Sequence, residues 1–487
     1  MTMHSLALNR VYRMSRSKDV PLTDDHMRVL EYAWVYYRKN SVGPLFRNIK
    51  KHTGVGREDL ADLFPAGLSS VYTWVGIPIQ SRDAACRPMA TIEVENPRDV
   101  YLDHNATTPI RSEVTEAMVE FLRDPASFGN PSSSYDVGSQ AFDVLDEARG
   151  RIAKGIGVDP AEIFFVGSGS EANNIAILGA ARQFRRSRGT DSGGSVVCTR
   201  IEHPSVLETV RYLGEQGFDL RWLDVKVDGT LDADQVAGAI SDHTALVSVM
   251  AANNEIGTVY PIGEIGQRCR DRGVPFFVDA IQAYGKIPIQ PKEMGISMLS
   301  LSGHKIYAPK GVGALYVDSD LDLPPLIHGG SQESGLRAGT ENVLGIMALG
   351  LAAKLAFAEM EGETARFLSL RGRFLEALSA AAPGAIINGT LQNRLPHNLS
   401  VGFPEIDAGS LLLSLNQIGI AVSAGSACSA GDDKVSHVLQ AIGAANDLYG
   451  TVRFSFGKRT TEDDLDYLFE HLPRILDRLA DERQSAA

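Results

Sequence analysis

The stretches VPFFVDAIQ at residues 274–282 and SMLSLSGHK at residues 297–305 decide the fold of this chain. Each is a short apolar run that ends in polar residues, which is typical of a buried parallel strand followed by a loop. Asp279 ends the first run and Lys305 follows the second. Because the carboxyl ends of parallel strands meet at one edge of a sheet, we expect this acid and this lysine to share a site.

Three more apolar runs have the same form, EIFFVGSGSE at 162–171, SVVCTRIEH at 195–203 and ALVSVMAANNE at 245–255. They alternate with helical stretches punctuated by glycine, a pattern that predicts an α/β domain with a mainly parallel sheet. We expect the five strand ends to converge on one place. After about residue 350 a long amphipathic helix at 348–381 precedes a smaller α+β subdomain.

Composition and charge exclude several classes of protein. The chain has 487 residues, of which 44% are hydrophobic and 22% charged, and a net charge of -13. These values indicate a soluble globular protein of two or three domains and argue against a protein that coats nucleic acid. The sequence has no secretory signal and no window of about 18 uncharged apolar residues, so we expect a cytoplasmic protein without a membrane span.

The four cysteines, Cys86, Cys198, Cys269 and Cys428, are too scattered for a disulfide framework or a CxxC zinc site. We therefore expect a reducing compartment and no bound metal. Cys198 lies inside an apolar strand and Cys269 in a helical stretch, so both are interpreted as structural. Cys86 and Cys428 remain as candidate reactive thiols.

An amine and an acid at neighbouring strand ends are what pyridoxal phosphate requires. Lys305 would bind the cofactor covalently, and Asp279 would keep its pyridine nitrogen protonated. The glycine-rich GSGSEANN at 167–174 precedes a predicted helix and supplies a candidate phosphate site at the helix amino terminus. Ser302 and His304 could supplement that site.

These residues belong to a longer set of motifs: YLDHNATTP, FGNPSSSY, GSGSEANN, IEHPSV, ANNEIGTVYP, VDAIQAYGK, SLSGHKIYAPKG, GGSQESGLRAGTEN, SAGSACSAG, SHVL and VRFSFG. In this order they resemble the cysteine desulfurases, fold-type I pyridoxal-phosphate enzymes of the class V aminotransferase group. The resemblance runs from about Val100 to about Leu479. It implies a mainly parallel central sheet, a smaller α+β C-terminal subdomain and a homodimer.

The resemblance also assigns roles at the cofactor. Lys305 matches the Schiff-base lysine, Asp279 the partner of the pyridine nitrogen, and Gln282 the contact of the phenolic oxygen. His203 matches the histidine that stacks on the ring, which is implied to move protons as well. The residues implied to hold the phosphate are Ser170, Ser302, His304 and Thr340, the last reaching across to the other subunit.

Substrate roles follow in the same way. Asn254 and Arg453 match the residues that hold the substrate carboxylate, Asn254 also lying against the cofactor, and Asn130 lies near the same pocket. Cys428, between small residues in SAGSACSAG, matches the nucleophile, and a thiolate there suits an exposed loop. The implied reaction converts L-cysteine to L-alanine and leaves a persulfide on Cys428. A selenocysteine lyase, or a sulfur-transfer scaffold with little turnover, remains an alternative.

The first 95 residues differ from the rest, because they hold 13 Lys and Arg against 10 Asp and Glu and two of the three tryptophans. Helical stretches are expected from Thr23, after Pro44 and at REDLADLF before Pro65. This part resembles the small sulfur-relay carriers of the DsrC/TusE type, whose arm cysteine would be Cys86. The alternative is a three-helix, winged-helix-like adaptor. A net charge of +3 makes direct nucleic-acid binding unexpected.

The expected domains are a helical carrier-like domain at 1–78, an arm and linker at 79–99, a cofactor-binding large domain at 100–350 and a small subdomain at 351–487 that carries the cysteine loop. Sulfur would pass to acceptor proteins, with Cys86 as the candidate first acceptor. The sequence leaves the final acceptor open among iron-sulfur scaffolds, tRNA-thiolating enzymes, DNA-modifying systems and sulfur-oxidation pathways.

Overall fold

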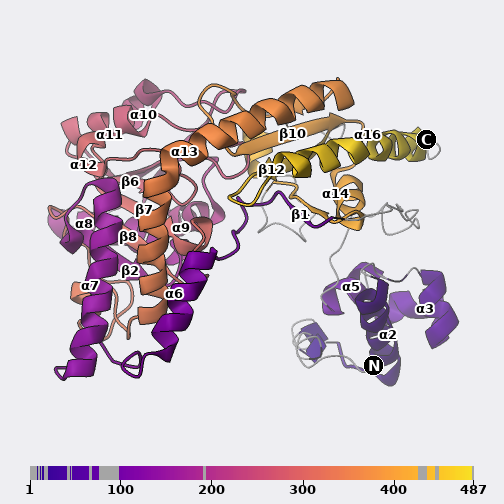
Figure 1. Ribbon diagram of the computed structural model, residues 1–487, viewed down its shortest axis with the longest axis horizontal. Helices are drawn as coiled ribbons and strands as arrows, with labels where there is room; N and C mark the ends of the chain where they lie inside the picture. The colour runs from indigo at the N-terminus through magenta and orange to yellow at the C-terminus, as the bar shows by residue number, and fades with distance from the viewer. Residues whose placement is uncertain are drawn as a thin grey trace. The chain divides into compact units, whose positions relative to one another are not determined.

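The computed structural model describes residues 8, 11–12, 14–15, 20–40, 44, 46–64, 68–75, 98–189, 193–425, 436–444 and 449–484. The described residues fall into two compact units, one that ends at residue 75 and one that begins at residue 98 (Figure 1). Cys86 and Cys428, the two candidate reactive thiols, lie outside the described residues.

The first unit contains helices α2 (Asp24–Asn40), α3 (Phe46–Thr53), α4 (Arg57–Leu63) and α5 (Leu68–Val75). The predicted helix start is confirmed, since α2 begins after Thr23, whose hydroxyl contacts His26 Nδ1 at 2.8 Å. The buried His26 ring lies against Phe64 and Trp74, and its Nε2 is 2.9 Å from the Leu63 carbonyl. Helix α5 was missed by the sequence analysis, although it contributes the buried Trp74 to this core.

A seven-stranded sheet forms the centre of the second unit. Its order is β2 (Ile163–Val166), β8 (Gly313–Val317), β7 (Met298–Ser302), β6 (Phe276–Asp279), β5 (Thr244–Ser248), β3 (Ser195–Thr199) and β4 (Asp219–Leu223). Neighbouring strands are parallel except at β8, which is antiparallel to both β2 and β7. The predicted mainly parallel sheet is confirmed, and the five predicted strands all run in one direction.

Helices cover both faces of this sheet. They are α6 (Ser112–Arg123), α7 (Asp136–Ile156), α8 (Gly169–Arg188), α9 (Pro204–Glu215), α10 (Ala233–Ala239), α11 (Ile262–Asp271) and α12 (Pro291–Met294). Because strand side chains alternate, Phe276 and Val278 pack with α7 and α11, whereas Phe277 packs with α8 and α9. Cys198 and Cys269 are fully buried in these two cores, as expected for structural thiols.

The smaller subdomain contains an antiparallel sheet of β9 (Ile386–Ile387), β10 (Asn398–Pro404) and β12 (Tyr449–Ser455), with helices α14 (Ala408–Gln417), α15 (His437–Ala441) and α16 (Glu462–Gln484). Strand β1 (Val100–Tyr101) pairs with β11 (Ile420–Ala421), so the start of the unit joins the smaller subdomain. Short 3-10 turns occur at η2 (Pro160–Glu162), η3 (Gly303–Lys305) and η4 (Gln332–Gly335).

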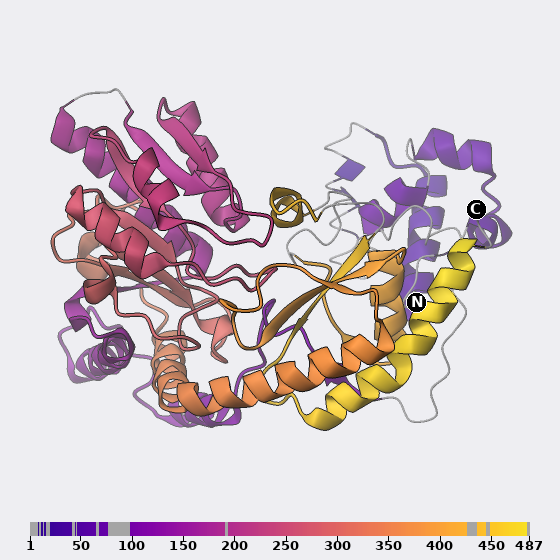
Figure 2. The ribbon, with the colours of Figure 1, turned by 90° about the horizontal axis from the view of Figure 1, so that it is seen from above.

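Helix α13 (Val343–Ala381) links the two subdomains and passes continuously through the expected boundary at residue 350. Its first half packs on α6 and α7 and its second half on α16 (Figure 2). Among the described helices it alone is long and apolar enough to cross a membrane by length and composition. Its residues Ala348, Leu349 and Ala352 are fully buried against the rest of the unit.

We expect Gly350→Ala to destabilise the protein. A Cβ at Gly350 would lie 2.6 Å from Ala148 Cα, where α13 meets α7. Overpacking of this kind lowers the free energy of unfolding by about 1–3 kcal/mol. Gly372→Ala, in the same helix, is the matched control, because a Cβ at Gly372 would have no neighbouring atom within 4 Å. This substitution should raise the free energy of unfolding by about 0.5–1 kcal/mol. Equal urea unfolding midpoints for the two variants would contradict this packing.

Candidate active site

The predicted acid and lysine lie at one edge of the sheet. Asp279 is the last residue of β6 and is 4% exposed, and Lys305 ends the turn η3 directly after β7. His203, at the amino terminus of α9, is close to both. Burial lowers the pKa of His203, the charge of Lys305 lowers it further, and the charge of Asp279 opposes these effects. The three side chains therefore share one electrostatic environment.

Asn105 connects several of the predicted residues. Its carbonyl accepts hydrogen bonds from Lys305 Nζ at 2.5 Å and from Gln282 Nε2 at 3.0 Å. Lys305 Nζ also donates to the Ala106 carbonyl at 2.7 Å. The lysine and the glutamine are thus held by the same short segment, which the sequence analysis quoted as a motif without giving Asn105 a role.

Asn254 and Arg453, the residues expected to bind the substrate, belong to the same hydrogen-bond network. The carbonyl of Asn254 accepts from Asn105 Nδ2 at 3.1 Å and from Arg453 Nη1 at 2.8 Å. Arg453 is 1% exposed and also donates through Nη2 to Asp103 Oδ1 at 2.7 Å. The Arg453 Nε atom is buried and has no hydrogen-bond partner among the described residues. A buried guanidinium of this kind can bind a carboxylate through its planar fork of N–H donors.

Asp279 and His203 are joined by two residues that the sequence analysis missed. Asn173 Nδ2 donates to Asp279 Oδ2 and to Ser205 Oγ, both at 2.9 Å. Ser205 Oγ lies 2.7 Å from His203 Nδ1, and the Ser205 N–H donates to the same nitrogen at 3.1 Å. Asn173 lies within GSGSEANN and Ser205 within IEHPSV, so the motifs contained both residues without indicating the contact.

Two of the phosphate candidates, Ser170 and Ser302, lie at the amino terminus of α8. Ser170 is in its first turn, and a Cβ at Gly169 would come within 2.2 Å of Ile281 Cδ1, so a larger residue there would displace the Ile281 side chain. Ser302 is buried at the end of β7, and His304 Nδ1 lies 3.1 Å from Thr107 Oγ1. Burial and the charge of Lys305 lower the pKa of His304 to about 4, so its ring is neutral at pH 7.

These residues fit pyridoxal phosphate. The site combines a lysine amine, a buried carboxylate and an imidazole with a helix amino terminus suited to a phosphate. Gln282 Oε1 and Asn173 Oδ1 are buried there without a hydrogen-bond partner among the described residues, as expected of groups that face a ligand. Lys305, Asp279, His203 and Gln282 would hold the ring, and Ser170, Ser302 and His304 the phosphate.

The other predicted site residues either lie apart from this hydrogen-bond network or fall outside the described residues. Asn130 and Thr340 are exposed, and within the described residues neither has a recorded side-chain contact to the network above. The Asn130 side chain accepts instead from the Ser132 N–H at 3.0 Å. Cys428 and Cys86 lie outside the described residues.

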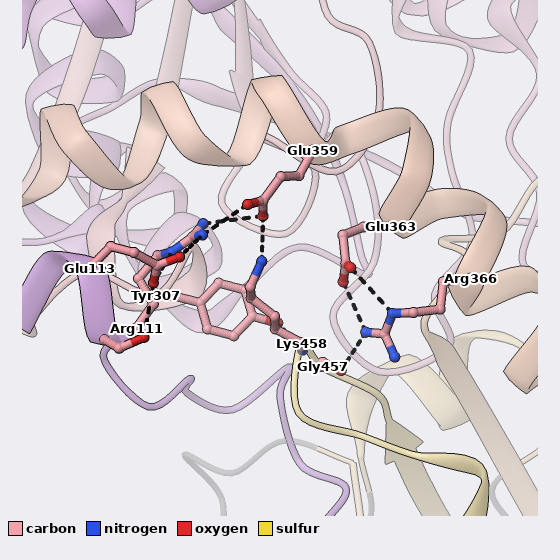
Figure 3. Close-up of polar contacts among 9 residues, drawn as sticks. Arg111, Glu113, Tyr307, Glu359, Glu363, Arg366, Gly457 and Lys458 are labelled. Atoms are coloured by element: carbon pink, nitrogen blue, oxygen red, sulfur yellow. Dashed lines mark hydrogen bonds and ion pairs between the residues drawn. The ribbon is translucent and has the colours of Figure 1, made fainter.

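A cavity of about 50 Å³ lies beside Lys305 and is also lined by Lys286, His104 and His397. Around it, Glu359 on α13 binds both Arg111 and Lys458, and Glu363 binds Arg366 (Figure 3). Lys286 Nζ, by contrast, is buried without a hydrogen-bond partner among the described residues. Burial and the charge of Lys305 lower the pKa of Lys286 to about 7.

Comparison with known proteins supports the family resemblance that the sequence motifs indicated. The family model for class-V aminotransferases matches residues 100–468. A cysteine desulfurase IscS of Dictyoglomus turgidum is 43% identical over 383 residues, which are 78% of this chain and 95% of that protein. A solved NifS-like protein has a TM-score of 0.72 at 35% identity, covering 78% of this chain and 100% of its own. SspA, solved in complex with cysteine, has a TM-score of 0.64 at 36% identity, covering 73% and 98%.

We expect Lys286→Met to stabilise the protein at pH 7. The folded chain binds fewer protons at Lys286 than the unfolded chain between pH 7 and 10.5, so the stability of the wild type should rise with pH across this window. Within this window, Lys286 makes the free energy of unfolding of the wild type rise by about 1.4 kcal/mol per pH unit. The advantage of the variant should therefore shrink from pH 7 to pH 9, as measured by urea unfolding.

Lys354→Met, which removes an exposed lysine from α13, is the control and should leave the pH dependence unchanged. The electrostatic interpretation of the cavity is wrong if Lys286→Met unfolds with the same pH dependence as the wild type.

Proposed function

The chain belongs to the class-V aminotransferase family and is a pyridoxal-phosphate-dependent cysteine desulfurase, and we propose that it delivers sulfur from L-cysteine through Cys428 to acceptor proteins, Cys86 among them. The observation that carries the proposal is the network at Asn105, which joins the cofactor lysine Lys305 to the carboxylate-binding candidate Arg453.

Arg453 is proposed to bind the carboxylate of L-cysteine, with the Asn254 side chain beside it. Arg453 is held in place by Asp103 and by the Asn254 carbonyl, so it is oriented before the substrate arrives. Its burial excludes water and strengthens a charge-assisted hydrogen bond to the incoming carboxylate. Bound pyridoxal phosphate supplies an electron sink for the carbanion formed when the substrate loses its α-proton.

Cys428 is proposed as the nucleophile. Its thiolate attacks the substrate sulfur, a sulfur–sulfur bond forms, and the carbon–sulfur bond breaks. The electron pair of that bond remains with the substrate carbon, which takes up a proton and leaves as part of L-alanine. The terminal sulfur stays on Cys428 as a persulfide. Support for L-cysteine as substrate comes from the named activity of the IscS relative and from the cysteine bound to SspA.

A homodimer is proposed from exposed apolar side chains on α6, on α7 and on the segment between them. Leu122, Phe128, Tyr135 and Phe142 are 62, 79, 60 and 55% exposed. Exposed aromatic and aliphatic side chains that lie close together in the sequence favour a protein interface. A second copy would also give the exposed Thr340 a role, since the family resemblance places this residue at the phosphate of the other subunit.

The N-terminal unit is proposed to receive the sulfur first. Its Cys86 lies in the expected linker at 79–99, and a short tether raises the effective concentration of an acceptor thiol to roughly the millimolar range. The DsrC/TusE resemblance and a reducing cytoplasm fit this role. Iron-sulfur cluster assembly and tRNA thiolation are the acceptor pathways that we propose to test first.

Persulfide mapping by mass spectrometry tests the relay. After addition of L-cysteine, we expect the wild type to carry persulfide on both Cys428 and Cys86, and Cys428→Ala to carry none and to release no sulfide. Cys86→Ser is the matched variant and should retain the persulfide on Cys428 and the formation of alanine. Label on Cys428 but never on Cys86 would contradict the relay.

Two extensions of this experiment separate the alternatives. Mixing Cys428→Ala chains with Cys86→Ser chains places persulfide on Cys86 only if transfer crosses between subunits, and sedimentation of the same samples reports the dimer. A selenocysteine lyase would release selenium from selenocysteine in the Cys428→Ala variant. A scaffold would form no alanine from cysteine.

A further inference from the structure

We propose that Asn173 and Ser205 are positioning residues that fix the tautomer of His203, holding its proton on Nε2 and its lone pair on Nδ1. The charge of Asp279 sets this arrangement from the far end of the chain of hydrogen bonds. The inference rests on the cofactor site described above and does not depend on the sulfur relay.

Asp279 orients the Asn173 side chain. A carboxylate can only accept hydrogen bonds, so the group 2.9 Å from Asp279 Oδ2 is the amide nitrogen of Asn173 and not its oxygen. The other carboxylate oxygen accepts from the Ile281 N–H at 3.0 Å. Asn173 is 0% exposed, so water cannot offer an alternative partner that would allow the amide to turn over.

Asn173 in turn orients the Ser205 hydroxyl. The amide nitrogen has two hydrogens, and the second points at Ser205 Oγ, 2.9 Å away. The hydroxyl therefore accepts from Asn173 and has one hydrogen left to donate. The remaining neighbour of Ser205 Oγ is His203 Nδ1 at 2.7 Å, so that hydrogen goes to the imidazole.

His203 Nδ1 then receives two donors, the Ser205 hydroxyl and the Ser205 N–H at 3.1 Å. A nitrogen that accepts must present its lone pair, which places the proton of the neutral ring on Nε2. Burial and the charges of Lys305 and His437 lower the pKa of His203 against the opposing effect of Asp279. In this arrangement Nδ1 is occupied by its two donors, so a proton that His203 gives up or takes back moves at Nε2 alone.

The Asn173→Asp variant tests the chain with little change in shape. The new side chain accepts from Ser205 whether it is ionised or shares a proton with Asp279, so the Ser205 hydroxyl turns its hydrogen away from His203. Ser205 Oγ then presents a lone pair to Nδ1 and can accept from a protonated Nδ1, which the Ser205→Ala side chain cannot do. We expect the Nδ1 resonance of His203 to move from the unprotonated toward the protonated position in [¹⁵N]histidine NMR of the holoenzyme. The His203→Gln variant assigns the signal, and unchanged cofactor absorbance shows that the site is intact.

Ser205→Ala provides the control. It removes the hydroxyl but keeps the backbone donor, so Nδ1 should stay unprotonated, and adding Asn173→Asp in this background should then have no effect. An unchanged Nδ1 signal in the Asn173→Asp single variant, or an equal shift with and without Ser205, would overturn the proposal. Because the readout is a nitrogen resonance, this result is independent of whether the enzyme releases sulfur from cysteine.

Discussion

The hydrogen bonds of one short segment, Asp103 to Thr108, hold the two subdomains together at the active site. On one side, Ser455 Oγ accepts from the Asn105 N–H at 2.9 Å, which ties the segment to the C-terminal sheet. On the other side, the Thr108 N–H donates to the His304 carbonyl at 3.0 Å, which ties it to the lysine turn. Since the Asn105 carbonyl also accepts a hydrogen bond from Lys305 Nζ, the position of this lysine, which we propose to bind the cofactor, depends on both subdomains.

This constraint distinguishes two neighbouring lysines. Lys305 Nζ has two backbone carbonyls as acceptors, whereas Lys286 Nζ is buried without an acceptor among the described residues. Lys286 has a pKa of about 7, so its amine is partly neutral at physiological pH and chemically capable of attacking an aldehyde. What favours Lys305 is its position beside His203 and Gln282.

Much of the fold could be predicted from the sequence, because apolar runs and their polar ends are local signals. The five strands and the placement of Asp279 and Lys305 at one sheet edge follow from those signals. The contacts of Asn105, Asn173 and Ser205 could not be predicted, since the Asn173–Asp279 bond joins residues 106 apart and the Lys305–Asn105 bond residues 200 apart. Helix α5 was missed because it has neither an acidic first turn nor a basic last turn.

The identity of the lysine that binds the cofactor tests this account most directly. Borohydride reduction of the holoenzyme fixes pyridoxal phosphate to its lysine, and peptide mapping by mass spectrometry locates the modified residue. We expect the label on Lys305, within the peptide that follows β7, in the wild type and equally in Lys286→Met. Label on Lys286, or on any lysine outside the Asn105 network, would contradict it.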